Sequence, residues 1–228
     1  MTLRHKAVKA TLDKGLATEW NDDHQIDFTD ELMFYDTFFY GALQAFWSTA
    51  QCAAGGTAAI DLVSGHNFVK VASSAGGGGL GSMRLGTTDM TNKTDTPIAT
   101  FAAKLDTIAK AEIGFFKAGD TPFTANQDGA YFRIDANKIY AVTGDGADEE
   151  ANDITPVGFV AGTYAILRIE FTATTVKFYI DNLVTAVQIN TTHITTDDLT
   201  LKMSTGVSGG VSQILHADGA GLQRLRMK

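Results

Sequence analysis

Residues 162–181 read GTYAILRIEFTATTVKFYID, and this stretch decides the fold class. Its first half alternates two sets of side chains, with Tyr164, Ile166, Arg168 and Glu170 on one side and Ala165, Leu167, Ile169 and Phe171 on the other. A period of two residues is that of a half-buried β-strand. A threonine-rich turn at 172–175 and a second strand-like run follow, so the sequence predicts an antiparallel hairpin here.

Similar short runs fill the chain on both sides of this hairpin. Extended segments are predicted at 97–106, 111–117, 129–135 and 138–143, and again at 183–189, 199–205, 212–217 and 222–228. Turn signals recur at about 8–12 residues, which is typical of a sandwich or barrel. No convincing amphipathic helix follows residue 50. The predicted fold class is therefore all-β, an antiparallel sandwich.

Composition and charge exclude several classes of function. The chain has 228 residues, of which 44% are hydrophobic, and a formal net charge of −8. This acidity argues against nucleic acid and against an anionic membrane as partners. The sequence shows neither a secretory signal nor an apolar run long enough to cross a bilayer. Cys52 is the single cysteine, and its small, apolar neighbours favour a buried thiol.

The first residues differ from the rest, which divides the chain in two. Residues 1–29 are polar with scattered apolar positions, and we expect them to form an extended arm or anchor. Residues 30–228 are expected to form the sandwich domain. Two loops stand out in it, a glycine-rich turn at 73–81 and an acidic loop at 144–153.

The hairpin, together with GAYFRID at 129–135 and LQRLRMK at the end, resembles the concanavalin A-like lectin/glucanase superfamily. The resemblance covers about residues 30–228 and implies a jelly-roll sandwich. It says little about function, because this fold hosts lectins, glycosidases, adhesion modules and structural domains.

A second resemblance concerns the arm. GLATEWNDDHQI at 15–26 is similar to segments near the start of bacteriophage virion proteins, and the matching residues are Trp20, Asn21 and His24. The resemblance implies that these three residues anchor the protein to a partner. For His24, which lies beside Asp22 and Asp23, a capped turn is the alternative favoured over a metal ligand.

Glycoside hydrolysis needs two carboxylates flanking the scissile bond. Several jelly-roll glucanases present them on one strand as Glu-x-Asp-x-x-Glu, and no strand here shows that spacing. Glu170 lies next to Arg168 and Lys177, which indicates a surface ion pair. The acidic loop lacks neighbouring aromatic residues to stack a sugar. The sequence therefore predicts that the chain is not an enzyme.

No cofactor or metal site is predicted. The acidic residues of 144–153 offer oxygen ligands that suit calcium, but their spacing misses the calcium-loop pattern, and a solvated loop is favoured. The five histidines are dispersed, and no lysine with serine or threonine follows the glycine run to make a phosphate loop. The aromatic cluster at 34–47 indicates core and subunit packing, with a carbohydrate-stacking face as the alternative.

Two functions follow from these observations. The preferred one is a structural subunit of a virion, a surface decoration or appendage protein anchored by its arm to other virion proteins and repeated as a homo-oligomer. The alternative is a lectin-like carbohydrate-binding module that recognises a host glycan. Only two tryptophans, Trp20 and Trp47, are present, which argues against a tryptophan-lined groove.

Overall fold

The structure is a computed structural model, and it describes residues 31–38, 43–49, 51–63, 66–76, 78–155, 160–181 and 183–225. Within these residues the chain forms two antiparallel sheets and one 3-10 turn, η1 (Lys93–Asp95). Across the same part of the chain, no helix is long and apolar enough to span a membrane. The predicted arm at 1–29, with Trp20, Asn21 and His24, lies outside the described residues.

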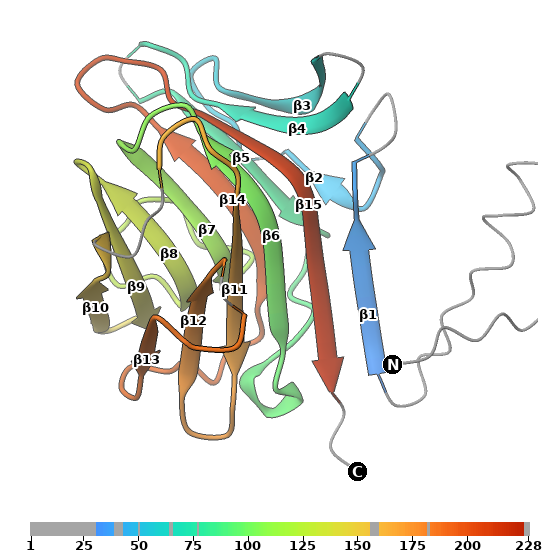
Figure 1. Cartoon of the computed structure of the whole chain (residues 1–228), viewed down its shortest axis with the longest axis vertical. Coiled ribbons are helices and arrows are strands. Elements are labelled where there is room, and N and C mark those ends of the chain that lie inside the picture. Colours follow the sequence, from blue (N-terminus) through green and yellow to red (C-terminus); the bar gives the residue numbers. More distant parts are fainter. Residues whose placement is uncertain are drawn as a thin grey trace, which may run out of the picture.

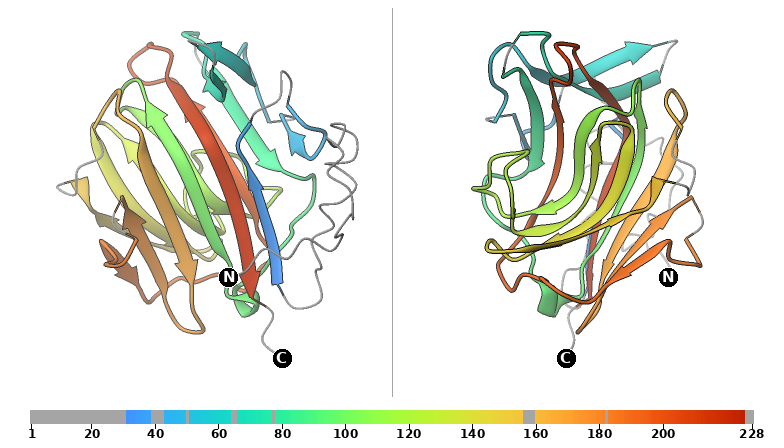
Figure 2. Two further views of the ribbon diagram at one scale, coloured as in Figure 1. Left: turned by 45° about the vertical axis from the view of Figure 1, so that its right-hand side comes forward. Right: turned by 90° about the vertical axis from the view of Figure 1, so that its left-hand side faces the viewer.

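The two sheets lie face to face (Figures 1 and 2). The eight-stranded sheet has the order β13-β12-β11-β6-β15-β4-β3, and β1 also pairs with β15. Its strands are β1 (Glu31–Asp36), β3 (Thr57–Val63), β4 (His66–Ala72), β6 (Ile98–Leu105), β11 (Ala165–Phe171), β12 (Val176–Ile180), β13 (Gln188–Asn190) and β15 (Ile214–Leu225).

The seven-stranded sheet has the order β10-β9-β8-β7-β14-β5-β2, and its strands curve in the side view (Figure 2). Its strands are β2 (Trp47–Ser48), β5 (Leu80–Leu85), β7 (Lys110–Phe116), β8 (Gly129–Asp135), β9 (Lys138–Gly144), β10 (Glu149–Asp153) and β14 (Thr200–Gly206).

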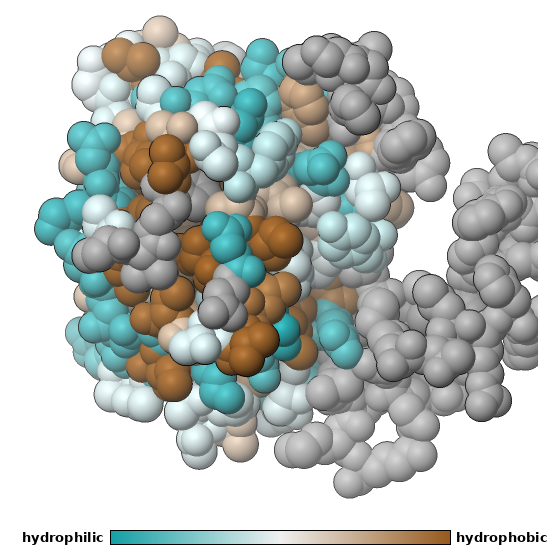
Figure 3. Space-filling model, in the orientation of Figure 1, coloured by the Kyte–Doolittle hydropathy of each residue, from teal (hydrophilic) through white to brown (hydrophobic). Residues whose placement is uncertain are grey.

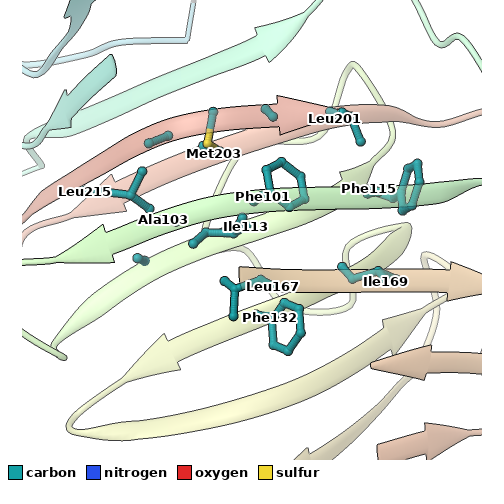
Figure 4. Close-up of a cluster of buried hydrophobic side chains, with 14 of the residues drawn as sticks. Phe101, Ala103, Ile113, Phe115, Phe132, Leu167, Ile169, Leu201, Met203 and Leu215 are labelled. Carbon is teal, nitrogen blue, oxygen red and sulfur yellow. The ribbon is translucent and has the colours of Figure 1, made fainter. Parts of the chain in front are cut away.

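The core fills the space between the sheets. Phe101 and Leu167 from the eight-stranded sheet face Phe115, Phe132 and Met203 from the other (Figure 4). These five side chains are at most 1% exposed. Two edge-to-face ring pairs cross the gap, Phe115 with Phe171 and Phe132 with Phe178. Such pairs contribute beyond the burial of their area.

The predicted all-β jelly-roll sandwich is confirmed. The hairpin forms as β11 and β12, with Leu167 opposite Ile180 and Phe171 opposite Val176. Along β11 the burial alternates as predicted, with Ala165, Leu167 and Ile169 facing the core. The described part of the chain after residue 50 contains no α-helix.

Three local predictions differ from the structure. Of the extended segment predicted at 183–189, only Gln188 and Ile189 lie in a strand, β13. The acidic segment predicted as a loop contributes an edge strand, β10, which pairs with β9. The end of the chain, predicted as separate short strands, forms one long strand, β15, which shifts register between Ala217 and Gly219. Bulges of this kind let a strand bend and continue.

Candidate functional site

The seven-stranded sheet carries an unusual set of residues on its outer face, the face turned away from the core. Because side chains alternate along a strand, β7 turns Ala111, Ile113 and Phe115 inward and the residues between them outward. The outer face is here defined by Lys110, Glu112, Phe116, Tyr131, Arg133, Tyr140, Val142, Lys202, Arg84 and Ser82. Phe116, Tyr131 and Val142 form a small buried cluster on it, which gives this face an apolar centre.

A pocket of about 430 Å³ opens over one half of the outer face. It is lined by Lys110, Glu112, Phe123, Thr124, Ala125, Arg133, Ile134, Asp135, Tyr140 and Glu149. The sheet register explains why these residues meet, since Glu112 pairs across strands with Arg133, and Arg133 pairs with Tyr140. Its volume falls within the ~300–1,000 Å³ typical of small-molecule sites.

Arg133 and Glu149 form a two-bond ion pair at this pocket. The guanidinium of Arg133 donates to both carboxylate oxygens of Glu149, at 2.9 and 2.8 Å. Both side chains are about a quarter exposed, so they reach solvent. The guanidinium also lies over the ring of Tyr140, 5.5 Å from its centroid. The pair is therefore rigid, charged and open to a ligand.

Glu112 is the buried acid of the site. Its two carboxylate oxygens accept hydrogen bonds from the backbone N–H of Phe123 and from the Gln127 amide, each at 2.9 Å. The residue is 0% exposed, and this burial raises its pKa above the usual value although both hydrogen bonds act in the opposite direction. A carboxyl group with a raised pKa is one of the marks of a functional site.

Lys202 is the buried base on the same face. It projects from β14 and is 0% exposed. Its ammonium donates to the backbone carbonyl of Asp120 at 2.7 Å and lies 5.1 Å from the centroid of the Phe116 ring. Burial lowers its pKa to about 8, despite the nearby carboxylates of Asp120 and Glu112.

Three carboxylates of the acidic segment have protein partners. Glu149 is paired with Arg133, and Asp153 with Lys138 at 2.8 Å. Glu150 accepts from the backbone N–H groups of Thr191 and Thr192. Across the described residues, no group of three or more His, Cys, Asp and Glu side chains could hold a metal ion.

The other residues considered in the sequence have structural partners. Glu170 pairs with Arg168 of its own strand at 3.2 Å, and it also accepts from the Tyr179 hydroxyl. Cys52 is half-buried, and its Sγ contacts the backbone of Ser82. The aromatic cluster divides, since Trp47 is buried and donates to Asp36 at 2.8 Å, whereas Phe46 is exposed.

The eight-stranded sheet has an outer face of a different kind. Figure 3 shows apolar residues gathered in its left half, over β11 and β12. On and beside β11–β13 the exposed apolar side chains are Val160, Tyr164, Ile166, Leu183, Val184 and Ile189. The charged pocket described above therefore lies on the opposite side of the sandwich from this apolar surface.

Comparisons with known proteins support the fold of the chain but do not assign it to a family. No family model matches the chain, and no curated protein matches it. Among solved structures it is similar to SCLam, a non-specific endo-β-1,3(4)-glucanase from family GH16, with a TM-score of 0.60 and 12% identity over 87% of this chain and 92% of that one.

Two further structures illustrate the range of this fold. A Bacillus licheniformis β-glucanase matches with a TM-score of 0.57 and 14% identity, over 86% of this chain and 98% of its own. The Emp47p carbohydrate recognition domain matches with a TM-score of 0.58 and 11% identity, over 88% and 100%. The chain thus has the concanavalin A-like jelly-roll fold that glycanases and lectins share. Nothing in these comparisons supports a bacteriophage virion protein.

The prediction that the chain is not an enzyme is contradicted by the comparisons, which point to an enzyme fold. The fold is one that glucanases use, as the SCLam and Bacillus structures demonstrate. The prediction relied on the absence of paired carboxylates on a single strand. The sheet brings Glu112 and Glu149 into one pocket from two different strands, β7 and β10. A search along one strand cannot detect such a pair.

Sequence reasoning missed the main residues of this pocket. Glu112 is a lone acid within the apolar run AEIGFF, and Arg133 is a lone base within GAYFRID. In each predicted strand this residue alternates with the inward-facing apolar residues and therefore points outward. This alternation was the signal that could have identified it. Which of these residues meet depends on the register in which β7, β8 and β9 pair, and the sequence does not display that register.

Proposed function

We propose that the protein binds a carbohydrate in the pocket on the outer face of the seven-stranded sheet. The observation that carries the proposal is the Arg133–Glu149 ion pair set beside the Tyr140 ring within a pocket of about 430 Å³. The similarity of the fold to glucanases and to a carbohydrate recognition domain supports it.

The chemistry of the pocket suits a sugar. A guanidinium has five N–H donors and a carboxylate about four lone-pair sites. The ion pair uses two of each, so both groups keep capacity for hydroxyls. Tyr140 and Phe123 add ring carbons that can pack against the C–H groups of a sugar ring. A few fixed polar groups among apolar walls are the usual make-up of a ligand site.

A glycan array with paired variants tests this proposal. Arg133→Gln removes one side of the ion pair and is expected to weaken binding about 10- to 150-fold, since hydrogen bonds to charged groups contribute about 1.5–3 kcal/mol. The matched control is Arg168→Gln on the outer face of the other sheet, where Arg168 likewise contacts a glutamate, Glu170, and lies over a tyrosine ring, Tyr179. Equal effects of both variants, or wild-type protein that binds no glycan, would contradict the proposal.

Glycoside hydrolysis is the second candidate function, and one observation favours it. Of the three carboxyl groups that line the pocket, two lie in clearly different surroundings, Glu112 buried with a raised pKa and Glu149 held in an ion pair. Glycosidases need one protonated and one ionised carboxyl group at the bond they cleave. Release of reducing ends from β-1,3-1,4-glucan, abolished in Glu112→Gln, is the expected result. Binding without release in the wild type excludes this candidate.

The role in a virion stays a prediction. It depends on residues 1–29, which lie outside the described part of the chain. The virion location, the virion partners and the homo-oligomer also stay predictions. Labelling purified particles with an antibody against residues 30–228 is the experiment that tests it. Regular labelling is expected, and unlabelled particles would contradict it.

A further inference from the structure

The connection between β7 and β8, residues 117–128, is unusually long for a hairpin, and we call it the strap. β7 and β8 are neighbouring antiparallel strands, which two to five residues can join. Here Lys117 donates to the carbonyl of Asp128 at 3.1 Å, so ten residues remain beyond the last closed pair. Long connections in compact domains commonly have a function.

The strap folds over the outer face of the seven-stranded sheet instead of extending into solvent. On β14, Lys202 donates to the carbonyl of Asp120. Gln51 donates to the same carbonyl at 2.9 Å, and Arg84 of β5 donates to the carbonyl of Ala118. This part of the strap therefore covers the β14 and β5 half of the outer face.

The remainder of the strap is attached to β7. Phe123 donates its backbone N–H to Glu112 while in a left-handed conformation, with φ of 63°, which is uncommon for a residue other than glycine. Gln127 donates to the second oxygen of the same carboxylate. Asp128 accepts from the hydroxyl of Thr195. The strap is thus fixed at both ends by buried side chains.

These contacts divide the outer face into a covered half and an open half. Phe123, Thr124 and Ala125 at the inner edge of the strap form one wall of the pocket. The rest of the pocket lies over β7, β8, β9 and β10. A polymer lying across the strands of this face would meet the strap before it reached β14. In that direction the pocket can accept the end of a chain, but a chain cannot continue past the strap.

From this arrangement we infer that the pocket recognises the end of a glycan chain or a short oligosaccharide, and not an internal stretch of a polymer. The inference rests on the proposed carbohydrate-binding function and specifies its ligand class. The strap is the element that sets this specificity. Its buried anchors, Glu112 and Lys202, hold it in place without any ligand.

Calorimetric titration with β-1,3-1,4-glucan oligosaccharides and with the long polymer tests the inference on the full chain. Recognition of chain ends gives one protein molecule bound per glycan chain at every length. Recognition of internal stretches gives a number that rises with chain length, which would overturn the inference and leave carbohydrate binding standing. Failure to bind any glycan on the array overturns the proposed function itself, and the inference with it.

Two further measurements test the role of the strap itself. Amide hydrogen exchange without ligand is expected to show slow exchange at Phe123 and Ala118, whose N–H groups donate to Glu112 and Asp89. Exchange at the rate of an open loop would overturn the inference. Replacing residues 118–127 with an Asn-Gly turn, which suits a two-residue hairpin, is expected to raise the number of protein molecules bound per polymer. An unchanged number in this variant, with its melting transition intact, would also overturn it.

Discussion

Glu112→Ala tests whether the buried carboxyl group holds the strap on the sheet. The substitution removes both acceptors and leaves two donors without their partner, the part-buried N–H of Phe123 and the buried Gln127 amide. An unpaired buried donor costs about 1–3 kcal/mol and a part-buried one less, so the free energy of unfolding should fall by about 1–4 kcal/mol. Relief from burying the carboxyl group offsets part of this loss.

Urea denaturation measures the effect, with a shift in midpoint at an unchanged slope. Glu170→Ala is the control, because Glu170 accepts from Tyr179 and Arg168 but is about a quarter exposed, so water can replace it. We expect the control to lose less than about 1 kcal/mol. Equal midpoints for Glu112→Ala and the wild-type protein would refute the role given to Glu112.

The pH dependence of stability gives a second view of the same residue. Burial raises the pKa of Glu112 above its unfolded value. Between the two pKa values the folded protein binds more protons than the unfolded chain, so stability falls as pH rises through this window, which begins near pH 4.5. Glu112→Gln removes this contribution, and its stability curve should be flatter there. Parallel curves would contradict the raised pKa.

The remaining predictions concern the core and the other buried polar groups. Phe101→Ala is expected to lower the free energy of unfolding by about 3–5 kcal/mol, because the ring is fully buried between the sheets. Ile166→Ala, at an exposed position, should change it by no more than about 0.5 kcal/mol. Thermal unfolding of the two variants measures the difference. Lys202 has its pKa lowered to about 8, so the folded protein binds fewer protons than the unfolded chain above that pH. Stability should rise between pH 8 and 10.5 in the wild type and not in Lys202→Met, and equal slopes would contradict the burial of the ammonium. Trp47→Phe leaves the buried Asp36 without its indole partner and should lose about 1–3 kcal/mol by urea denaturation.

The sequence predicted the fold class because its strands carry a clear period of two. The run from Tyr164 to Phe171 shows the alternation directly, and the structure places its two sides as predicted. β10 was missed because Glu149–Asp153 is poor in the β-branched and aromatic residues that mark strands. Among the described strands it pairs only with β9, at the edge of the sheet.

The candidate site was less accessible to sequence reasoning for a physical reason. β7, β8, β9 and β10 follow one another in the chain, but the register in which they pair decides which of their side chains meet. The pocket combines Glu112, Arg133 and Glu149 from three of these strands through that register. The strap leaves no sequence signature, because its anchors are backbone groups and single side chains such as Gln51 and Lys202. Its position becomes evident only in the folded sheet.

Amide chemical-shift mapping by NMR, with a glycan that binds on the array, tests the central claim most directly. The account predicts that the shifts concentrate at Lys110, Arg133, Tyr140 and Phe123 around the pocket. Shifts confined to the outer face of the eight-stranded sheet, around Ile166 and Ile189, would contradict it.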